Sequence, residues 1–372
     1  MDAMTIKYLD LQAINRPYEH AADGVLSSGW YLRGEATRRF EQHYAEYIGT
    51  RHCIGVANGL DALTLILRAY KEMGRLHDGD EVIVPANTYI ATILAITENS
   101  LTPVLVEPDI NTLQIDDTLI EQAITPKTRA VMIVHLYGRC AYTQRIGDIC
   151  KQYSLLLLED NAQAHGCRVG RSVDLGRPGA LTGSLGHAAA HSFYPGKNLG
   201  AFGDAGAVTT GDDELAAVIR SIANYGSSRK YVFDYVGRNS RIDELQAAVL
   251  DAKLCALDSD NRRRKEIASL YNNKVSNPAV VIPRCDRDHV YHIFPVLSPR
   301  RDELQQFLSS HGVETVIHYP IPPHKQACYR QWNSLSFPLT ERIHREELSI
   351  PCNQAMTDKE ADYIVDLLNA FR

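Results

Sequence analysis

The sequence lacks the signatures of several large protein classes. Its eight cysteines contain no C-x-x-C pair, which excludes a zinc ribbon and a thioredoxin-like site. A G-x-G-x-x-G fingerprint and a G-x-x-x-x-G-K-[ST] loop are also absent, which argues against nicotinamide and nucleoside-triphosphate chemistry. His318 and His324 lie close together, but no H-E-x-x-H motif or carboxylate spacing accompanies them. We therefore expect no metal site.

Charge and long apolar segments are equally scarce. The 39 basic and 45 acidic residues give a net charge of −6, so we expect neither nucleic acid nor a membrane surface as a partner. The one basic run, residues 262–265, is interpreted as a solvated helix face. No apolar run approaches the roughly 20 residues of a membrane span, and the N-terminus lacks a signal-peptide core. Reduced thiols in a cytoplasmic protein are the expectation.

The pattern between about residues 50 and 210 predicts an α/β fold. Short runs rich in β-branched residues alternate with longer amphipathic stretches, as in a parallel sheet with crossover helices. The predicted strands are 81–84, 103–106, 130–135 and 155–158. Their continuous apolar runs indicate burial on both faces, and polar residues follow each of them. A functional site is therefore expected at the carboxyl ends of the strands.

Beyond residue 240 the pattern changes. Apolar positions from Leu245 to Ala256 recur at helical spacing and predict a long helix that links two domains. Further elements predicted in this part are a strand at 289–296, a helix with Ser298 as N-cap and Pro299 at its first position, a strand at 313–317, and a terminal helix opened by the capping box of Thr357 and Glu360. We predict a large domain at 1–245 and a small α+β domain at 246–372, and whether the N-terminal segment packs on the small domain stays open.

Three motifs suggest chemistry. Asn58-Gly59-Leu60 precedes an apolar helix at 63–70, so free backbone N–H groups could hold a phosphate, although an ordinary N-cap is the alternative. Asp160 follows an apolar strand and needs a cation or strong donors there, unless it caps a turn. Lys197 lies in a glycine-rich stretch, where the alternative is a solvated charge. Together, a phosphate cradle, a buried carboxylate and a lysine describe the needs of pyridoxal phosphate (PLP).

A collinear set of motifs extends this interpretation over nearly the whole chain. The motifs are Ser28-Gly29-Trp30-Tyr31-Leu32, Pro85-Ala86-Asn87-Thr88-Tyr89, His135-Leu136-Tyr137-Gly138, residues 159–166, Ser192-Phe193-Tyr194-Pro195-Gly196-Lys197-Asn198 and His318-Tyr319-Pro320. With them the chain resembles the DegT/StrS family of nucleotide-sugar aminotransferases, which have fold type I. This resemblance implies a large, mostly parallel seven-stranded sheet domain and a small C-terminal domain.

The resemblance also implies roles for individual residues. Lys197 corresponds to the lysine that forms a Schiff base with PLP, Asp160 to the partner of the pyridine nitrogen, and Gln163 to a neighbour of the ring hydroxyl. The other positions carried over are Tyr89 for ring stacking, Asn58, Gly59, Leu60 and Ser192 for the phosphate, Asn239 for the phosphate of a neighbouring subunit, and Tyr31, Tyr194, His318 and Tyr319 for the sugar. A homodimer with shared sites follows. For Tyr194, His318 and Tyr319, ordinary packing is the alternative.

Within the family, residues 58–63 and 194–200 resemble the branch that acts on dTDP-linked 3-keto-6-deoxyhexoses, with L-glutamate as donor. A dTDP-3-amino-3,6-dideoxyhexose for a surface glycan such as lipopolysaccharide, or for a secondary metabolite, would be the product. Alternatives are a 4-keto sugar or another cyclic ketone, and a non-catalytic regulator or scaffold. Lys197 argues against the family's dehydratases, in which histidine replaces this lysine. Gly186-His187 and a long stretch at 168–183 depart from the family pattern.

Overall fold

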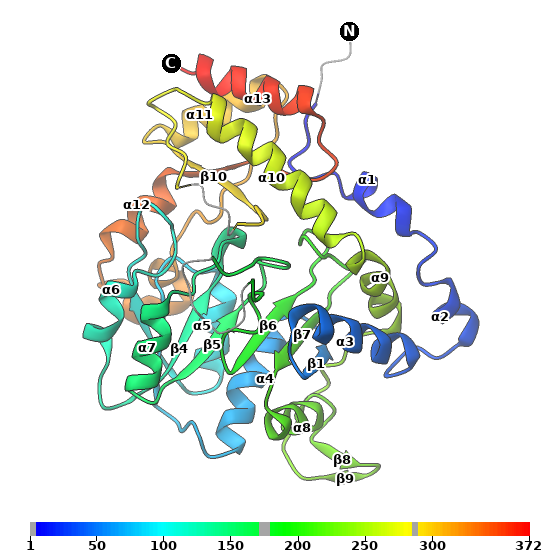
Figure 1. Cartoon of the computed structure of the whole chain (residues 1–372). Coiled ribbons are helices and arrows are strands. Elements are labelled where there is room, and N and C mark those ends of the chain that lie inside the picture. The colour runs from blue at the N-terminus through cyan, green and yellow to red at the C-terminus, as the bar shows by residue number, and fades with distance from the viewer. Residues whose placement is uncertain (1–4, 171–178, 285–288) are drawn as a thin grey trace.

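The computed structural model describes residues 5–170, 179–284 and 289–372. Its centre is a seven-stranded sheet with the order β1-β7-β6-β5-β4-β2-β3 (Figure 1). The strands are β1 (His52–Val56), β2 (Glu81–Pro85), β3 (Thr102–Val106), β4 (Thr128–Val134), β5 (Leu156–Asp160), β6 (Ala188–Ser192) and β7 (Gly206–Thr210). Only β7 runs against the others, since it pairs antiparallel with both neighbours. The predicted mostly parallel sheet is therefore confirmed, and all four predicted strands exist.

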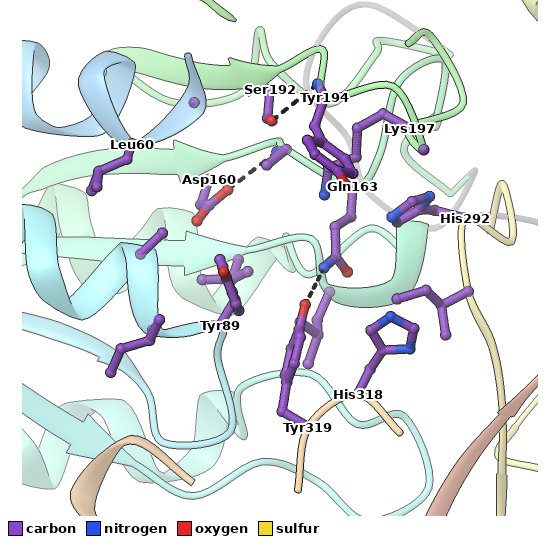
Figure 2. A pocket seen from close by; sticks show the side chains of 18 of the residues that line it. Leu60, Tyr89, Asp160, Gln163, Ser192, Tyr194, Lys197, His292, His318 and Tyr319 are labelled. Carbon is purple, nitrogen blue, oxygen red and sulfur yellow. Dashed lines mark hydrogen bonds between the residues drawn. The ribbon is translucent and has the colours of Figure 1, made fainter. Parts of the chain in front are cut away.

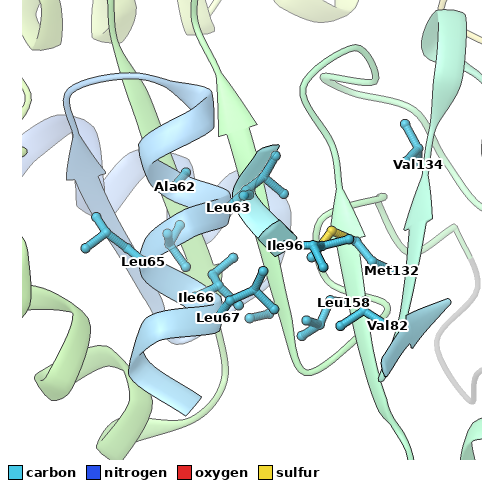
Figure 3. Close-up of a cluster of buried hydrophobic side chains, with 14 of the residues drawn as sticks. Ala62, Leu63, Leu65, Ile66, Leu67, Val82, Ile96, Met132, Val134 and Leu158 are labelled. Atoms are coloured by element: carbon cyan, nitrogen blue, oxygen red, sulfur yellow. The ribbon is translucent and has the colours of Figure 1, made fainter. Parts of the chain in front are cut away.

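Alternating side chains of these strands enter two cores. On β2, Val82 and Val84 face one apolar cluster, whereas Ile83 faces the opposite one. The period of two is that of an extended strand, and its two faces are both covered by helices. Figure 3 shows one of these cores, in which Leu63 and Ile66 of a helix lie against the sheet. Burial on both faces explains why the strands are almost continuously apolar.

Helices form a layer on each side of the sheet. One face is covered by α4 (Gly59–Glu72), α5 (Ile90–Glu98) and α8 (Asp213–Ile222). The other face is covered by α3 (Glu35–Ile48), α6 (Asp117–Ile120), α7 (Gln144–Gln152) and α9 (Glu244–Leu254). Along one margin of Figure 1 run α1 (Leu11–Asn15) and α2 (Asp23–Ser28), and a hairpin of β8 (Ser227–Arg229) and β9 (Val232–Phe233) projects at another.

A second, two-stranded sheet has its own core. It consists of β10 (Phe294–Leu297) and β11 (Glu347–Ile350), and α10 (Leu257–Lys274), α11 (Arg301–Ser310) and α13 (Asp358–Ala370) contribute to its apolar cluster. A further helix is α12 (Pro338–Glu346). Figure 1 shows α10 running from the large sheet to α13. Ile6 belongs to the same cluster and pairs with Val313, so the N-terminal segment packs on this part.

Several predicted element bounds in this region are wrong. The linking helix is two helices, because α9 ends at Leu254 and α10 begins at Leu257. Ser298 is not an N-cap: its amide donates to the carbonyl of Glu346, so it continues the path of β10, and α11 starts at Arg301. The strands expected at 289–296 and 313–317 are also shorter, since β10 covers only 294–297 and the second segment makes isolated bridges. The capping box of Thr357 is confirmed.

The interpretation of the basic run as a solvated face is wrong for one residue. Arg262 is exposed, whereas Arg264 on the same helix, α10, is buried and only 2% exposed. Ile267, Ala268 and Tyr271 follow Arg264 at helical spacing and are all buried, so Arg264 lies on the apolar face of the helix. This helical spacing of apolar residues could have identified Arg264 as buried from the sequence alone.

The sequence also predicts no membrane span, no metal site and reduced cysteines. Among the described residues, no helix is long and apolar enough to cross a bilayer, and no group of His, Cys, Asp or Glu is arranged to hold a metal ion. The seven described cysteines are free thiols, and Cys285 lies outside the described residues. Of the stretch at 168–183, residues 171–178 also lie outside them.

Candidate active site

A cavity of about 620 Å³ lies beyond the carboxyl ends of β4 and β5, as the sequence predicts. Figure 2 shows its lining. Eleven of the candidate residues contribute to this lining: Asn58, Gly59, Leu60, Tyr89, Asp160, Gln163, Ser192, Tyr194, Lys197, His318 and Tyr319. The other two, Tyr31 and Asn239, do not line it. The fold therefore gathers residues from five separate motifs at one place.

One wall is the N-terminus of α4. The helix begins at Gly59, four residues before the predicted start, with Asn58 as N-cap: its Oδ1 accepts from the amide of Asp61 at 2.8 Å. The amides of Gly59 and Leu60 have no partner within the helix, and the helix dipole adds positive potential there. Glycine is required, because a Cβ on Gly59 would lie 2.5 Å from Cβ of Ser192. The result is a tight cradle suited to a phosphate.

Asp160 ends β5 inside the cavity and is 6% exposed. Its carboxylate accepts from the hydroxyl of Thr92 at 2.8 Å and from the amide of Ala162 at 3.1 Å. Burial raises the pKa of Asp160, and the Thr92 hydrogen bond partly offsets this effect. A nearby cationic group would favour its charged form. Thr92 was not anticipated from the sequence.

Lys197 follows β6 in a tight turn, where its amide donates to the carbonyl of Tyr194 at 2.8 Å. The side chain lines the cavity. Desolvation lowers the pKa of Lys197 to about 8, against the opposing field of Asp160. A larger fraction of this amine is therefore neutral at physiological pH than for an exposed lysine, which favours nucleophilic attack on a carbonyl.

Gln163 connects three parts of the site. Its Oε1 accepts from the amide of Tyr137 at 2.5 Å, and its Nε2 donates to the hydroxyl of Tyr319 at 3.0 Å. The ring of Tyr319 lies 4.9 Å from that of Tyr89, which is 48% exposed at the start of α5. Figure 2 shows Gln163, Tyr319 and Tyr89 close to one another in the cavity. The half-exposed ring of Tyr89 offers a surface for a planar ligand.

Two residues of β11 in the small sheet hold His318 through a chain of hydrogen bonds. Nδ1 of His318 lies 2.8 Å from Oγ of Ser349, which donates to the carboxyl group of Glu347. Glu347 also accepts from the backbone amide of His318 at 2.6 Å. Burial raises the pKa of Glu347 to about 8 and lowers that of His318 to about 4. The imidazole is therefore neutral and fixed in orientation at the cavity wall.

Tyr31 and Asn239 lie on the surface. Asn239 is exposed and pairs with Asn224, while Tyr31 is half exposed beside α9, where its carbonyl accepts from the amide of Glu244. Neither side chain lines this cavity.

The departure at Gly186-His187 lies away from the cavity. His187 Nδ1 accepts from the amide of Leu157 at 3.0 Å, at the end of β5 opposite Asp160. Glu159 holds the neighbouring loop through the amides of Gly183, Leu185 and Gly186. His187 therefore stabilises the start of β5 through this hydrogen bond and contacts none of the candidate residues named above.

Comparison with known proteins gives a consistent result. The model of the DegT/DnrJ/EryC1/StrS aminotransferase family matches residues 13–369. A dTDP-3-amino-3,6-dideoxy-alpha-D-galactopyranose transaminase of Aneurinibacillus thermoaerophilus is 50% identical and covers 98% of this chain and 99% of its own. A dTDP-3-amino-3,4,6-trideoxy-alpha-D-glucose transaminase of Streptomyces venezuelae is 42% identical over 97% of this chain and 94% of its own. The crystal structure of S. venezuelae DesV with a ketimine intermediate has a TM-score of 0.91, 41% identity and 98% coverage of both chains. The chain belongs to the DegT/DnrJ/EryC1/StrS aminotransferase family.

Proposed function

We propose that this protein is a PLP-dependent aminotransferase that moves an amino group from L-glutamate to a dTDP-linked 3-keto-6-deoxyhexose. The products are 2-oxoglutarate and a dTDP-3-amino-3,6-dideoxyhexose. The observation that carries the proposal is the meeting of Lys197, Asp160 and the α4 N-terminus in one cavity. The relatives named for dTDP-3-amino sugars support the choice of acceptor. Free thiols and a nucleotide-sugar substrate favour the cytoplasm as the location.

The residues present fit this cofactor. The amides of Gly59 and Leu60, with Ser192, would hold its phosphate, and Tyr89 would stack on its ring. Asp160 would face the ring nitrogen and Gln163 the ring hydroxyl. The closeness of Gly59 to Ser192 leaves no space for a side chain at position 59. When bound, PLP supplies the aldehyde that takes the amino group and a ring that accepts electrons.

Each catalytic residue then has a defined task. With PLP bound, Asp160 would lie beside the ring nitrogen and favour its protonated form. Nζ of Lys197 would take the proton from the α-carbon of the donor as a general base and deliver a proton as a general acid. The same amine would move the proton in the reverse direction for the sugar. The neutral imidazole of His318 and the hydroxyl of Tyr319 would hold sugar hydroxyls, and Tyr194, which lines the same cavity and is exposed, would contact the sugar as well.

The acceptor is tested with matched substrates. The purified protein is incubated with L-glutamate and either a 3-keto or a 4-keto dTDP-6-deoxyhexose, and 2-oxoglutarate and the position of the new amino group are measured. Amination at C3 alone supports the proposal. Amination at C4 would replace the acceptor while keeping the chemistry, and no transfer from any amino acid would contradict the proposed function.

Substitution of Gly59 tests the phosphate cradle. In Gly59→Ala the new Cβ collides with Ser192, so the first amides of α4 must shift. We expect the Kd for PLP to rise about 10- to 100-fold, as for loss of a hydrogen bond to a charged group. Fluorescence titration of the apoprotein measures it. Gly24→Ala is the matched control, since a Cβ there meets nothing within 4 Å; equal affinities in the two variants would argue against the cradle.

We also propose that the protein works as a homodimer with shared sites. Large apolar side chains are exposed on two segments that meet next to Asn239: Trp30 at 65% and Val236 at 83%. These segments meet because Leu32 pairs with Asp243 and Asn224 with Asn239. Exposed apolar surface is a feature of protein–protein interfaces. A second copy that covers this surface would bring Asn239 to the phosphate of its partner.

Mixed dimers test this arrangement. Lys197→Ala and Asn239→Ala should each be nearly inactive alone. After unfolding and refolding together, about one quarter of wild-type activity should return, since half of the dimers are mixed and each has one intact site. No recovery, despite mixed dimers seen by native mass spectrometry, would mean that Asn239 does not act across an interface.

A further inference from the structure

Within the described residues, Arg264 is a buried cation that forms no ion pair with an acid. Its Nη1 donates to the carbonyls of Tyr291 at 3.2 Å and Cys352 at 2.6 Å. Its Nε has no hydrogen-bond partner among the described residues. Arginine stays charged in proteins, and a buried charge with unused donors is unfavourable unless an anion binds it.

The acids around Arg264 do not neutralise it. Asp260 lies one turn earlier on α10 and its field reaches Arg264, but its carboxylate accepts from Gln354, and no ion pair joins it to Arg264 within the described part of the chain. Glu347 lies near Tyr8, which also senses Arg264. With a pKa raised to about 8, Glu347 is mostly uncharged at neutral pH. The hydroxyl of Tyr8 is also neutral, because burial raises its pKa.

Arg264 and Lys197 line the same cavity. Asn261, one turn before Arg264, accepts from Nδ2 of Asn198, the residue after Lys197. His292 lines the same cavity and its Nδ1 is 3.3 Å from Oδ1 of Asn198; burial lowers its pKa, and the charges of Lys197 and Arg264 lower it further. Figure 2 shows Lys197, His292 and His318 along this side of the cavity.

We propose that Arg264 binds a carboxylate of the amino donor. This inference rests on the proposed function, because it assumes that an amino acid enters this cavity. A guanidinium forms charge-assisted hydrogen bonds with a carboxylate, and Arg264 lines the cavity with its Nε still unpartnered among the described residues. The phosphate of the cofactor has its own cradle at Gly59, on a different wall. The donor would bring its amine to Lys197, and a carboxylate on the same small molecule would then face Arg264 in the same cavity.

The two half-reactions separate this role from a structural one. In Arg264→Met, we expect the Kd for L-glutamate in the first half-reaction to rise about 10²-fold, as for loss of one partner of a buried charge pair. The second half-reaction, in which the aminated enzyme meets the ketosugar, should change less than threefold. Arg264→Lys should recover part of the donor affinity. Arg262→Met, an exposed neighbour in the same run, is the matched control and should behave as wild type. Stopped-flow absorbance follows both half-reactions.

A binding measurement completes the test without turnover. Glutarate carries two carboxylates and no amine, and calorimetry should detect its binding to the wild-type holoenzyme and to Arg264→Lys, but not to Arg264→Met. Equal loss of both half-reactions with glutarate binding retained would overturn the proposal. Loss of the sugar half-reaction alone would assign the cation to the diphosphate of the sugar and also overturn it. If wild type transfers no amino group but binds glutarate through Arg264, the proposed function fails and the carboxylate site stands.

Discussion

In Lys197→Ala, the rate of amino transfer should fall at least about 10³-fold, because one substitution removes both the nucleophile and the proton carrier. The fold should survive, since the Nζ of Lys197 makes no hydrogen bond within the described residues and only its backbone amide holds the turn. Rapid mixing of the enzyme with L-glutamate, followed by absorbance, measures the first half-reaction. The visible band of lysine-bound PLP should be absent, even when PLP is retained.

The control is Lys151→Ala, which removes an exposed lysine at the end of α7. Retained turnover in Lys197→Ala, with unchanged circular dichroism, would refute the assignment of this residue. The lowered pKa adds a pH test. Because burial brings the pKa of Lys197 to about 8, the neutral amine increases as pH rises through that value. Capture of PLP by the apoprotein should accelerate over the same range.

Asp160→Asn should reduce kcat by about 10²- to 10³-fold, the usual size for one preorganised electrostatic contact. Asparagine keeps the shape of the side chain but cannot hold a proton on a neighbouring ring nitrogen. Its amide would also meet the hydroxyl of Thr92, which now donates to Oδ2 of Asp160. The cofactor should still bind, since Gly59 and Ser192 are untouched.

Two further variants locate the effect. Thr92→Val removes the orienting hydroxyl and should cause a smaller loss of kcat with the charge retained. Asp160→Glu keeps the charge but lengthens a side chain that is 6% exposed, so activity should fall without being abolished. Full activity in Asp160→Asn would show that ring protonation does not depend on this carboxylate.

Much of the large sheet could be predicted from the sequence, and the reason is burial on two faces. Runs such as Val82–Val84 and Val131–Ile133 are apolar at every position because helices cover both sides. Catalytic candidates could also be found, since Asp160 and Lys197 follow strands that end at the same edge. The resemblance to a family added roles that spacing alone left open.

The small sheet was less predictable. Its segment at 313–317 makes isolated pairs instead of a continuous ladder, and Ser298 looks like a cap but extends β10. Residues such as Thr92, His292 and Glu347 reach the site only through tertiary packing, so no local pattern identifies them. Arg264 is different, because the helical spacing of its apolar neighbours carries the information. The interpretation of residues 262–265 as a solvated face was wrong for Arg264 because it considered only the charge of these residues. The boundary between domains near residue 245 stays a prediction.

Because β7 runs antiparallel to its neighbours, it begins beside the cavity and ends at the opposite edge of the sheet, where a label could be attached. Its first residue, Gly206, packs against Asn58 beside the cavity, and its last, Thr210, leads to the opposite edge. The turn at Gly211 is exposed there, and a side chain at this position would meet nothing within 4 Å. A fluorophore or surface tether at Gly211 would thus report on the enzyme from the side remote from its chemistry.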